Sequence, residues 1–185
     1  MNVCVFCASG SQLAPVYVDA AKRLGLWIGR GRHTLVWGGC NVGLMDVVGR
    51  AVRDSGGRTH AVIPSFLVER GLAFPDPDER TVTPDMQARK ASFRSLADAY
   101  VALPGGVGTW EEVFEVLALK KLEQLKAPIV LADIGGYYQP LLEQLRRSYA
   151  EGFTAPEIET LYDVARDADA VVACLERALG QRRSS

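Results

Sequence analysis

Residues 104–112, PGGVGTWEE, combine a glycine-rich turn with two neighbouring acidic side chains. Glycines let main-chain N–H groups approach an anion closely, and a helix that starts at such a turn directs its positive end toward the same point. We expect Thr109 to cap this helix and Glu111 and Glu112 to lie in its first turn. The combination predicts a phosphate cradle beside a carboxylate that can contact ribose hydroxyls, stabilise a developing cation or orient water.

Each part of this motif also has a purely structural explanation. Glycines serve tight turns, and acids in a first turn complement the helix dipole. Two other loops, CASGS (7–11) and GGCNVGLM (38–45), follow apolar runs in the same way. Three such loops at one sheet edge favour a phosphate or nucleotide site, to which Ser9, Gly39 and Gly43 would contribute. None has the spacing of a Walker or dinucleotide fingerprint.

Two basic residues, Arg89 and Lys90, begin the stretch ARKASFR. One interpretation is that a cation from this stretch reaches the phosphate or the reacting sugar. The alternative is an ordinary solvated face of a helix, which composition alone favours.

Short apolar runs alternate with longer segments of helical period along the chain, which predicts parallel strands joined by helices. The predicted strands are 3–9, 34–39, 59–64, 99–106, 128–133 and 160–165, and the predicted helices are 15–31, 42–57, 86–97, 109–125, 137–152 and 168–179. Right-handed crossovers then give an α/β, doubly wound, Rossmann-like sheet with helices on both faces. Ligands of such sheets bind beyond the carboxyl ends of the strands, where the three loops lie.

The alternation of apolar runs and helical segments is interrupted once, at residues 65–85. We interpret this segment as a loop with one short strand at 80–83, because it holds prolines and many acids. We expect a single nucleotide-binding domain over 1–180 and a mobile tail at 181–185. The helix 109–125 carries more apolar residues than one buried face needs, namely Phe114, Val116, Leu117, Leu119 and Leu122. This indicates either a second covered face, as in a dimer, or a wide contact with the sheet.

The overall composition limits the classes of partner. The 185-residue chain has a formal net charge of −1, which argues against nucleic acid or an acidic membrane as an electrostatic partner. No apolar stretch is long enough to span a bilayer. We expect a cytoplasmic protein with four free thiols, of which Cys4 and Cys7 are buried strand residues. His33 and His60 lie far from any cysteine pair, so no metal site is predicted.

Three segments in this order, GGCNVGLM, MQARK and LPGGVGTWEE, resemble the LONELY GUY (LOG) family, whose members were long labelled lysine decarboxylases. The family signature P-G-G-x-G-T-x-x-E is matched at Pro104, Gly105, Gly106, Gly108, Thr109 and Glu112. The resemblance extends from CVFCAS to GFTAPE at 152–157. It implies a homodimer without metal or organic cofactor that cleaves the N-glycosidic bond of nucleoside 5′-monophosphates, either cytokinin riboside monophosphates or AMP.

The resemblance also implies roles for individual residues. Arg89 and Glu112 would be the catalytic pair, and Glu69 would lie near the base. The remaining substrate-binding residues would be Met86, Lys90, Gly105, Gly106, Val107, Gly108, Thr109 and Glu111. The alternative is a non-catalytic carrier or sensor of a phosphorylated ligand, as in related Rossmann-like proteins that carry molybdenum cofactor, although a pure carrier has no chemical need for the pair.

Overall fold

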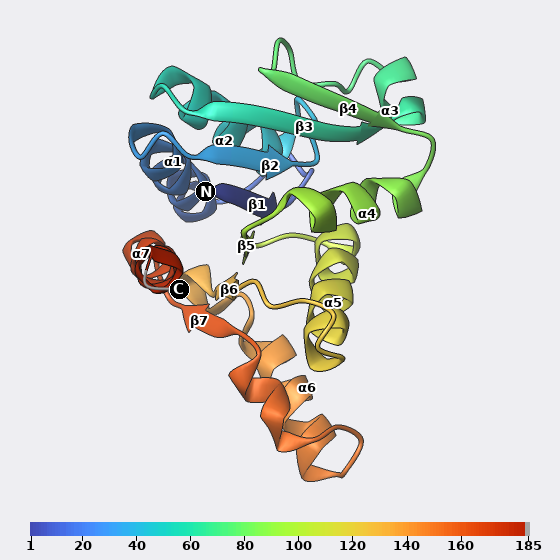
Figure 1. Cartoon of the computed structure of the whole chain (residues 1–185), viewed down its shortest axis with the longest axis vertical. Helices are drawn as coiled ribbons and strands as arrows, with labels where there is room; N and C mark the ends of the chain where they lie inside the picture. The colour runs from blue at the N-terminus through green and yellow to red at the C-terminus, as the bar shows by residue number, and fades with distance from the viewer. Residues whose placement is uncertain (184–185) are drawn as a thin grey trace.

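The computed structural model describes residues 1–183 as one alternating series of strands and helices (Figure 1). The elements are β1 Asn2–Phe6, α1 Pro15–Arg30, β2 Thr34–Trp37, α2 Gly43–Asp54, β3 Arg58–Pro64, α3 Ser65–Glu69, β4 Glu79–Thr83, α4 Met86–Leu96, β5 Ala99–Ala102, α5 Val107–Lys121, β6 Ile129–Ala132, η1 Ile134–Gly136, α6 Gln139–Ala150, η2 Pro156–Thr160, β7 Asp163–Ala165 and α7 Ala168–Arg183. The predicted α/β alternation is confirmed.

The strands form one seven-stranded sheet in the order β4-β3-β2-β1-β5-β6-β7, and every pairing is parallel. The chain winds outward from β1 in one direction as far as β4, then crosses back to β5 and winds outward in the other direction. Val5 is therefore paired with Trp37 of β2 on one side and with Val101 of β5 on the other. The carboxyl ends of β1 and β5 meet at this reversal, where doubly wound sheets bind ligands.

Two hydrophobic clusters cover the two faces of the sheet. Alternate residues of β1 point into different clusters: Val3 and Val5 pack with α1, α2 and α7, whereas Cys4 and Phe6 pack with α4, α5 and α6. Figure 1 shows α1 and α7 on the side of the sheet opposite to α4 and α5. Burial on both faces explains why the strand sequences are continuously apolar.

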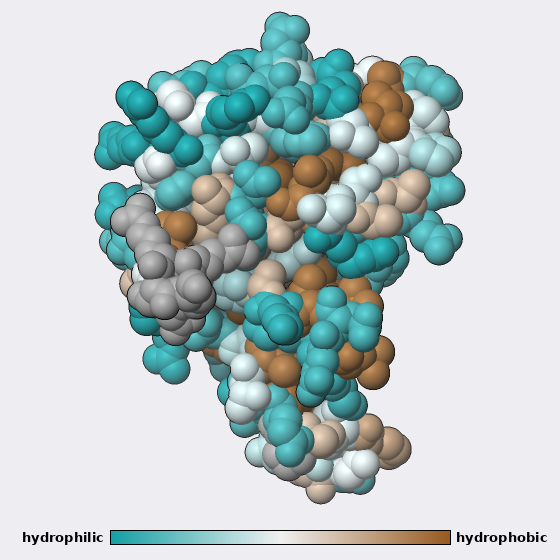
Figure 2. Space-filling view, in the orientation of Figure 1, coloured by the Kyte–Doolittle hydropathy of each residue, from teal (hydrophilic) through white to brown (hydrophobic). Residues whose placement is uncertain are grey.

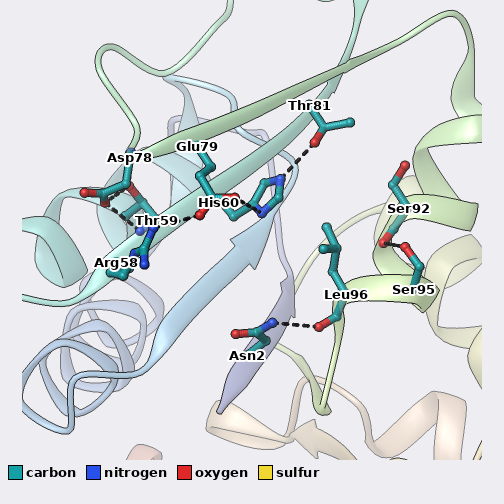
Figure 3. Close-up of polar contacts among 10 residues, drawn as sticks. All are labelled: Asn2, Arg58, Thr59, His60, Asp78, Glu79, Thr81, Ser92, Ser95 and Leu96. Atoms are coloured by element: carbon teal, nitrogen blue, oxygen red, sulfur yellow. Dashed lines mark hydrogen bonds and ion pairs between the residues drawn. The ribbon is translucent and has the colours of Figure 1, made fainter.

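Polar contacts hold the start of β1 and join the two strands at the β4 edge of the sheet (Figure 3). Asn2 at the start of β1 donates its side-chain N–H to the carbonyl of Leu96 at the end of α4, over 3.0 Å. At the sheet edge, the Nε2 atom of His60 and the hydroxyl of Thr81 share a hydrogen bond of 2.8 Å. These contacts join β1 to α4 and β3 to the edge strand β4.

Some local predictions differ from the structure. Residues 65–69 form the short helix α3 instead of part of a loop, whereas the predicted short strand is present as β4. Helix α5 begins at Val107, two residues before its predicted start. Helix α7 continues through Arg183 into the predicted tail, of which residues 184–185 lie outside the described residues.

Cys4, Cys7, Cys40 and Cys174 are all free and buried, as predicted for the thiols. Cys4 lies in β1 as expected, whereas Cys7 follows the last residue of that strand, Phe6. Burial raises the pKa of Cys4, Cys7 and Cys40. Over the described part of the chain, no helix is long and apolar enough to cross a membrane. The same residues contain no group of three or more histidine, cysteine or acidic side chains placed to hold a metal ion.

Candidate functional site

A cavity of about 320 Å³ opens at the carboxyl ends of β1 and β2 and at the start of α5. Seven of the predicted site residues line it: Ser9, Arg89, Gly106, Val107, Gly108, Thr109 and Glu112. The rest of its lining was not predicted residue by residue, although five of its members belong to the predicted loops 7–11 and 38–45. It is mostly apolar: Val5, Phe6, Cys7, Gly38, Cys40, Val42, Met45, Leu67 and Leu72. An apolar cavity with a few converging polar groups is typical of a small-molecule site.

The charged pair in this cavity consists of Arg89 from α4 and Glu112 from α5. Their side chains are 3.5 Å apart between Nη1 and Oε1, and both residues are buried, with 7% and 8% of their surfaces exposed. Arg89 also donates from Nε to the carbonyl of Val62 over 3.1 Å, and its guanidinium lies 5.1 Å from the ring centre of Phe93. These contacts hold the guanidinium in one place beside the carboxylate.

Helix α4 presents Arg89 to the cavity because its first turn is fixed. Asp85 caps the helix, and its carboxylate accepts a hydrogen bond of 2.7 Å from the Ala88 N–H. The Arg89 N–H then donates to the Asp85 carbonyl as the first turn closes. The cap at Asp85 therefore fixes the backbone position from which the Arg89 side chain extends.

Burial raises the pKa of Glu112 to about 7, against an ordinary value of 4.5. Arg89 acts in the opposite direction by stabilising the carboxylate, and the nearby acid Glu111 adds a smaller upward effect. A carboxyl group that titrates near neutrality can both accept and return a proton at physiological pH. Such a perturbed group in a cavity is a strong candidate for catalysis.

Gly106, which has no side chain to cap the helix, precedes the first residue of α5. The prediction that Thr109 caps α5 is therefore wrong: Thr109 is the third residue of the helix and is buried. Glu111 and Glu112 lie in the second turn, not the first, which contains no acid. The first main-chain amides of the helix consequently have no capping side chain, which suits them to bind an anion.

The glycines of this turn differ in what they do. A Cβ on Gly105 would lie 2.1 Å from the Thr109 hydroxyl oxygen, so packing alone requires glycine there. A Cβ on Gly106 or on Gly108 would meet no atom within 4 Å. Gly106 has φ of −90°, which any residue can adopt. These two glycines leave open space beside the cavity instead of filling a packing role.

The loop after β2 also contributes a glycine, but not one that the sequence singled out. A Cβ on Gly38 would lie 2.1 Å from Nη2 of Arg89, so any other residue there would displace the guanidinium from its place in the cavity. Gly39 and Gly43 do not line the cavity and have structural reasons to be glycine, since both have positive φ, of 62° and 57°. Gly38 lies in the candidate loop 38–45 predicted from the sequence, but it was not selected there as a site residue.

Three predicted residues lie on α4 and α5 outside the cavity lining. Lys90 binds the carboxylates of Glu111 and Glu115, the latter over 3.1 Å, and the hydrogen bond with Glu111 raises the pKa of Lys90. This network ties α4 to α5 next to the Arg89–Glu112 pair. Met86 is partly exposed, and its sulfur accepts a long contact of 3.7 Å from Nη1 of Arg89.

Glu69 is exposed at the end of α3 and does not line the cavity. Its neighbours Leu67 and Leu72 do line it. The segment therefore reaches the site through apolar side chains, whereas the sequence resemblance pointed to the acid.

The sequence is similar to a known family and to named proteins over most of its length. Residues 45–175 match the family model described as "Possible lysine decarboxylase". The chain is 38% identical over 175 residues to cytokinin riboside 5′-monophosphate phosphoribohydrolase LOG7 of Arabidopsis thaliana, covering 95% of this chain and 81% of that protein. It is 39% identical to the cytokinin riboside 5′-monophosphate phosphoribohydrolase of Rhodococcoides fascians, covering 94% of this chain and 88% of the relative.

Among solved structures, the fold is similar to the Moco carrier protein of Chlamydomonas reinhardtii, with a TM-score of 0.72 and 26% identity over 97% of each chain. The molybdenum cofactor binding protein of Rippkaea orientalis has a TM-score of 0.73 at 23% identity over 96% of each chain, a likeness of fold alone. The two sequence relatives carry the name phosphoribohydrolase, and together with the family model they show that the chain belongs to the LOG family.

Proposed function

We propose that this protein hydrolyses the N-glycosidic bond of nucleoside 5′-monophosphates, releasing the free base and ribose 5-phosphate. The observation that carries the proposal is the buried Arg89–Glu112 pair, which shares one cavity with the uncapped start of α5. The sequence relatives named as cytokinin riboside 5′-monophosphate phosphoribohydrolases support it. Cytokinin riboside monophosphates and AMP are the proposed substrates.

The chemistry follows from what each group can supply. The amides at the start of α5, from its N-cap Gly106 onward, bind the 5′-phosphate and set the sugar beside Glu112. When the C1′–N bond breaks, its electron pair leaves with the base, and the sugar takes on oxocarbenium character. The Glu112 carboxylate stabilises this cation and accepts a proton from the attacking water, whose oxygen bonds to C1′. The proton is then passed to the departing base, which leaves as the neutral free base. Arg89, next to it, balances the negative charge that develops on the leaving base.

The residues of the cavity do not favour decarboxylation of lysine. Pyridoxal-dependent decarboxylases hold their cofactor through a Schiff base with a lysine. None of the described residues that line the cavity is a lysine, and Lys90 is engaged with Glu111 and Glu115. The protein should therefore release no carbon dioxide from lysine, even when pyridoxal phosphate is supplied.

We also propose that the protein is a homodimer that uses α5 as part of its interface. Val107, Trp110 and Phe114 form a stripe along one side of this helix, with 75%, 40% and 42% of their surfaces exposed. Figure 2 shows hydrophobic surface over α5. Val116 and Leu117 are instead buried against the sheet, so α5 has two apolar sides.

A second candidate function is a carrier that holds a phosphorylated ligand without turnover, which the structural likeness to Moco carrier proteins favours. The two functions predict different outcomes for one assay. Purified protein is incubated with AMP and with isopentenyladenosine monophosphate, and free base is measured by chromatography.

Release of base that is lost in Glu112→Gln, with nucleotide binding retained, would support the hydrolase. Binding without release would support the carrier. A fully active Glu112→Gln variant would refute the role assigned to the carboxylate.

A further inference from the structure

The segment after β6 is a rigid turn that aims two tyrosines at the candidate phosphate turn. Asp133 is buried with 2% of its surface exposed, and its N–H donates to the Ala165 carbonyl of β7 over 2.7 Å. Its carboxylate accepts hydrogen bonds from the Tyr138 N–H, over 2.7 Å, and from the side-chain amide of Gln139. The buried carboxylate thus fixes the main chain at Tyr138, and with it the position from which both tyrosine side chains extend.

The two tyrosines donate to neighbouring carbonyls of the segment that joins β5 to α5. The Tyr137 hydroxyl donates to the Gly105 carbonyl, and the Tyr138 hydroxyl donates to the Leu103 carbonyl over 2.8 Å. The Tyr137 ring packs edge-to-face against Tyr17, with ring centres 6.1 Å apart, and against Tyr138, with centres 5.1 Å apart. The Tyr137 hydroxyl is therefore held in place by its surroundings.

The geometry of the peptide bond gives the first contact a consequence for the site. The Gly105 carbonyl and the Gly106 N–H belong to one trans peptide, so they point in opposite directions. Tyr137 draws the carbonyl toward a second cavity of about 290 Å³, which Tyr17 and Tyr137 line. The Gly106 N–H then points to the opposite side of the peptide. Gly106 itself lies between the two cavities and lines both of them, whereas Gly105 lines only the second.

We propose that Tyr137 is a positioning residue for phosphate recognition: its hydroxyl holds the Gly105 carbonyl, and this aims the Gly106 N–H at the phosphate. The inference rests on the proposed function, because it assumes that the phosphate binds at the start of α5. Without this hydrogen bond, the Gly105–Gly106 peptide is free to rotate. Rotation would present the carbonyl oxygen, which repels an anion, where the donor should be.

Tyr138 provides a matched control in the same turn. Its hydroxyl also donates to a carbonyl, but the peptide after Leu103 leads into Pro104, which has no N–H. Removing the Tyr138 hydroxyl therefore removes a buried hydrogen bond without releasing a phosphate donor. A purely structural role for these tyrosines would make the two variants alike.

The test compares wild type, Tyr137→Phe and Tyr138→Phe. Calorimetry measures the Kd for ribose 5-phosphate, and base release measures kcat and KM for AMP and for adenosine, which lacks the phosphate. For Tyr137→Phe we expect the Kd for ribose 5-phosphate and the KM for AMP to rise about tenfold, with kcat little changed. Adenosine lacks the group that Tyr137 is proposed to help bind, so any kcat/KM that wild type shows for adenosine should be retained in Tyr137→Phe. A circular dichroism spectrum equal to that of wild type shows that the variant is folded.

The results separate failure of the inference from failure of the proposed function. Wild-type affinity of Tyr137→Phe for ribose 5-phosphate, or an equal loss in Tyr138→Phe, would overturn the role of Tyr137. A wild-type protein that binds ribose 5-phosphate but releases no base would refute hydrolysis, while the binding comparison still tests Tyr137. If wild type binds neither ribose 5-phosphate nor AMP, both proposals fall.

Discussion

Replacing Glu112 by glutamine should change the stability of the protein in a pH-dependent way. The carboxyl group has an ordinary pKa of 4.5 and a pKa of about 7 in the folded protein, because it is buried. Between these two values the folded state binds more protons than the unfolded state, so the free energy of unfolding falls as the pH rises. Glutamine does not titrate and escapes this loss.

The size of the effect follows from the same two pKa values. Their difference, at about 1.4 kcal/mol for each pH unit, corresponds to about 3 kcal/mol. Both forms of the wild type are protonated at Glu112 below pH 4.5, so the term is absent there. Above pH 7 the folded wild type carries the full penalty of a buried carboxylate.

The assay is urea unfolding of wild type and Glu112→Gln at several pH values between 4.5 and 8. The difference in unfolding free energy should shift by about 3 kcal/mol in favour of the variant as the pH rises. All other titrating groups are common to the two proteins and cancel in the difference. A difference that stays constant over this range would show that Glu112 is not perturbed, and the argument for its acid–base role would fail.

Gly38→Ala should lower kcat about 100-fold, because a Cβ placed 2.1 Å from Nη2 of Arg89 must displace the guanidinium by roughly 1 Å. Normal base release by this variant would show that the position of Arg89 is unimportant. Gly106→Val should leave the unfolding temperature unchanged, because a Cβ at this position meets nothing within 4 Å. The added side chain should still block the approach of the phosphate and raise the KM for AMP about tenfold. An unchanged affinity would mean that the turn is only structural. Trp110→Glu should convert a dimer to a monomer in analytical ultracentrifugation, since Trp110 belongs to the exposed stripe of α5. A monomeric wild type would refute the interface.

The sheet was predictable from the sequence because its strands are buried on both faces and read as continuous apolar runs. The short helix α3 was not, because five residues between prolines and acids carry too little periodicity to indicate a helix. The early start of α5 was missed because glycine disfavours helices, and Gly108 lies in its first turn. This error moved Glu112 by one turn and gave Thr109 a cap that it does not form.

The candidate site was predicted in outline. Sequence motifs indicated Arg89 and Glu112, but spacing along the chain could not show that residues from two helices face one another at 3.5 Å. Nor could it show that the neighbouring Lys90 faces Glu111 and Glu115 instead of the cavity. Gly38 was missed because its importance depends on where the Arg89 guanidinium ends, which only the packing of α4 against the sheet determines.

The open amino end of α5 has a practical consequence for work with this protein. Its main-chain donors do not distinguish the phosphate of a nucleotide from other tetrahedral oxyanions, since they read only charge and oxygen geometry. If the nucleotide phosphate binds at this helix end as proposed, we expect sulfate carried over from precipitation, or phosphate in a buffer, to compete with the nucleotide for the same place. Affinities should therefore be measured after exhaustive dialysis into a zwitterionic or amine buffer.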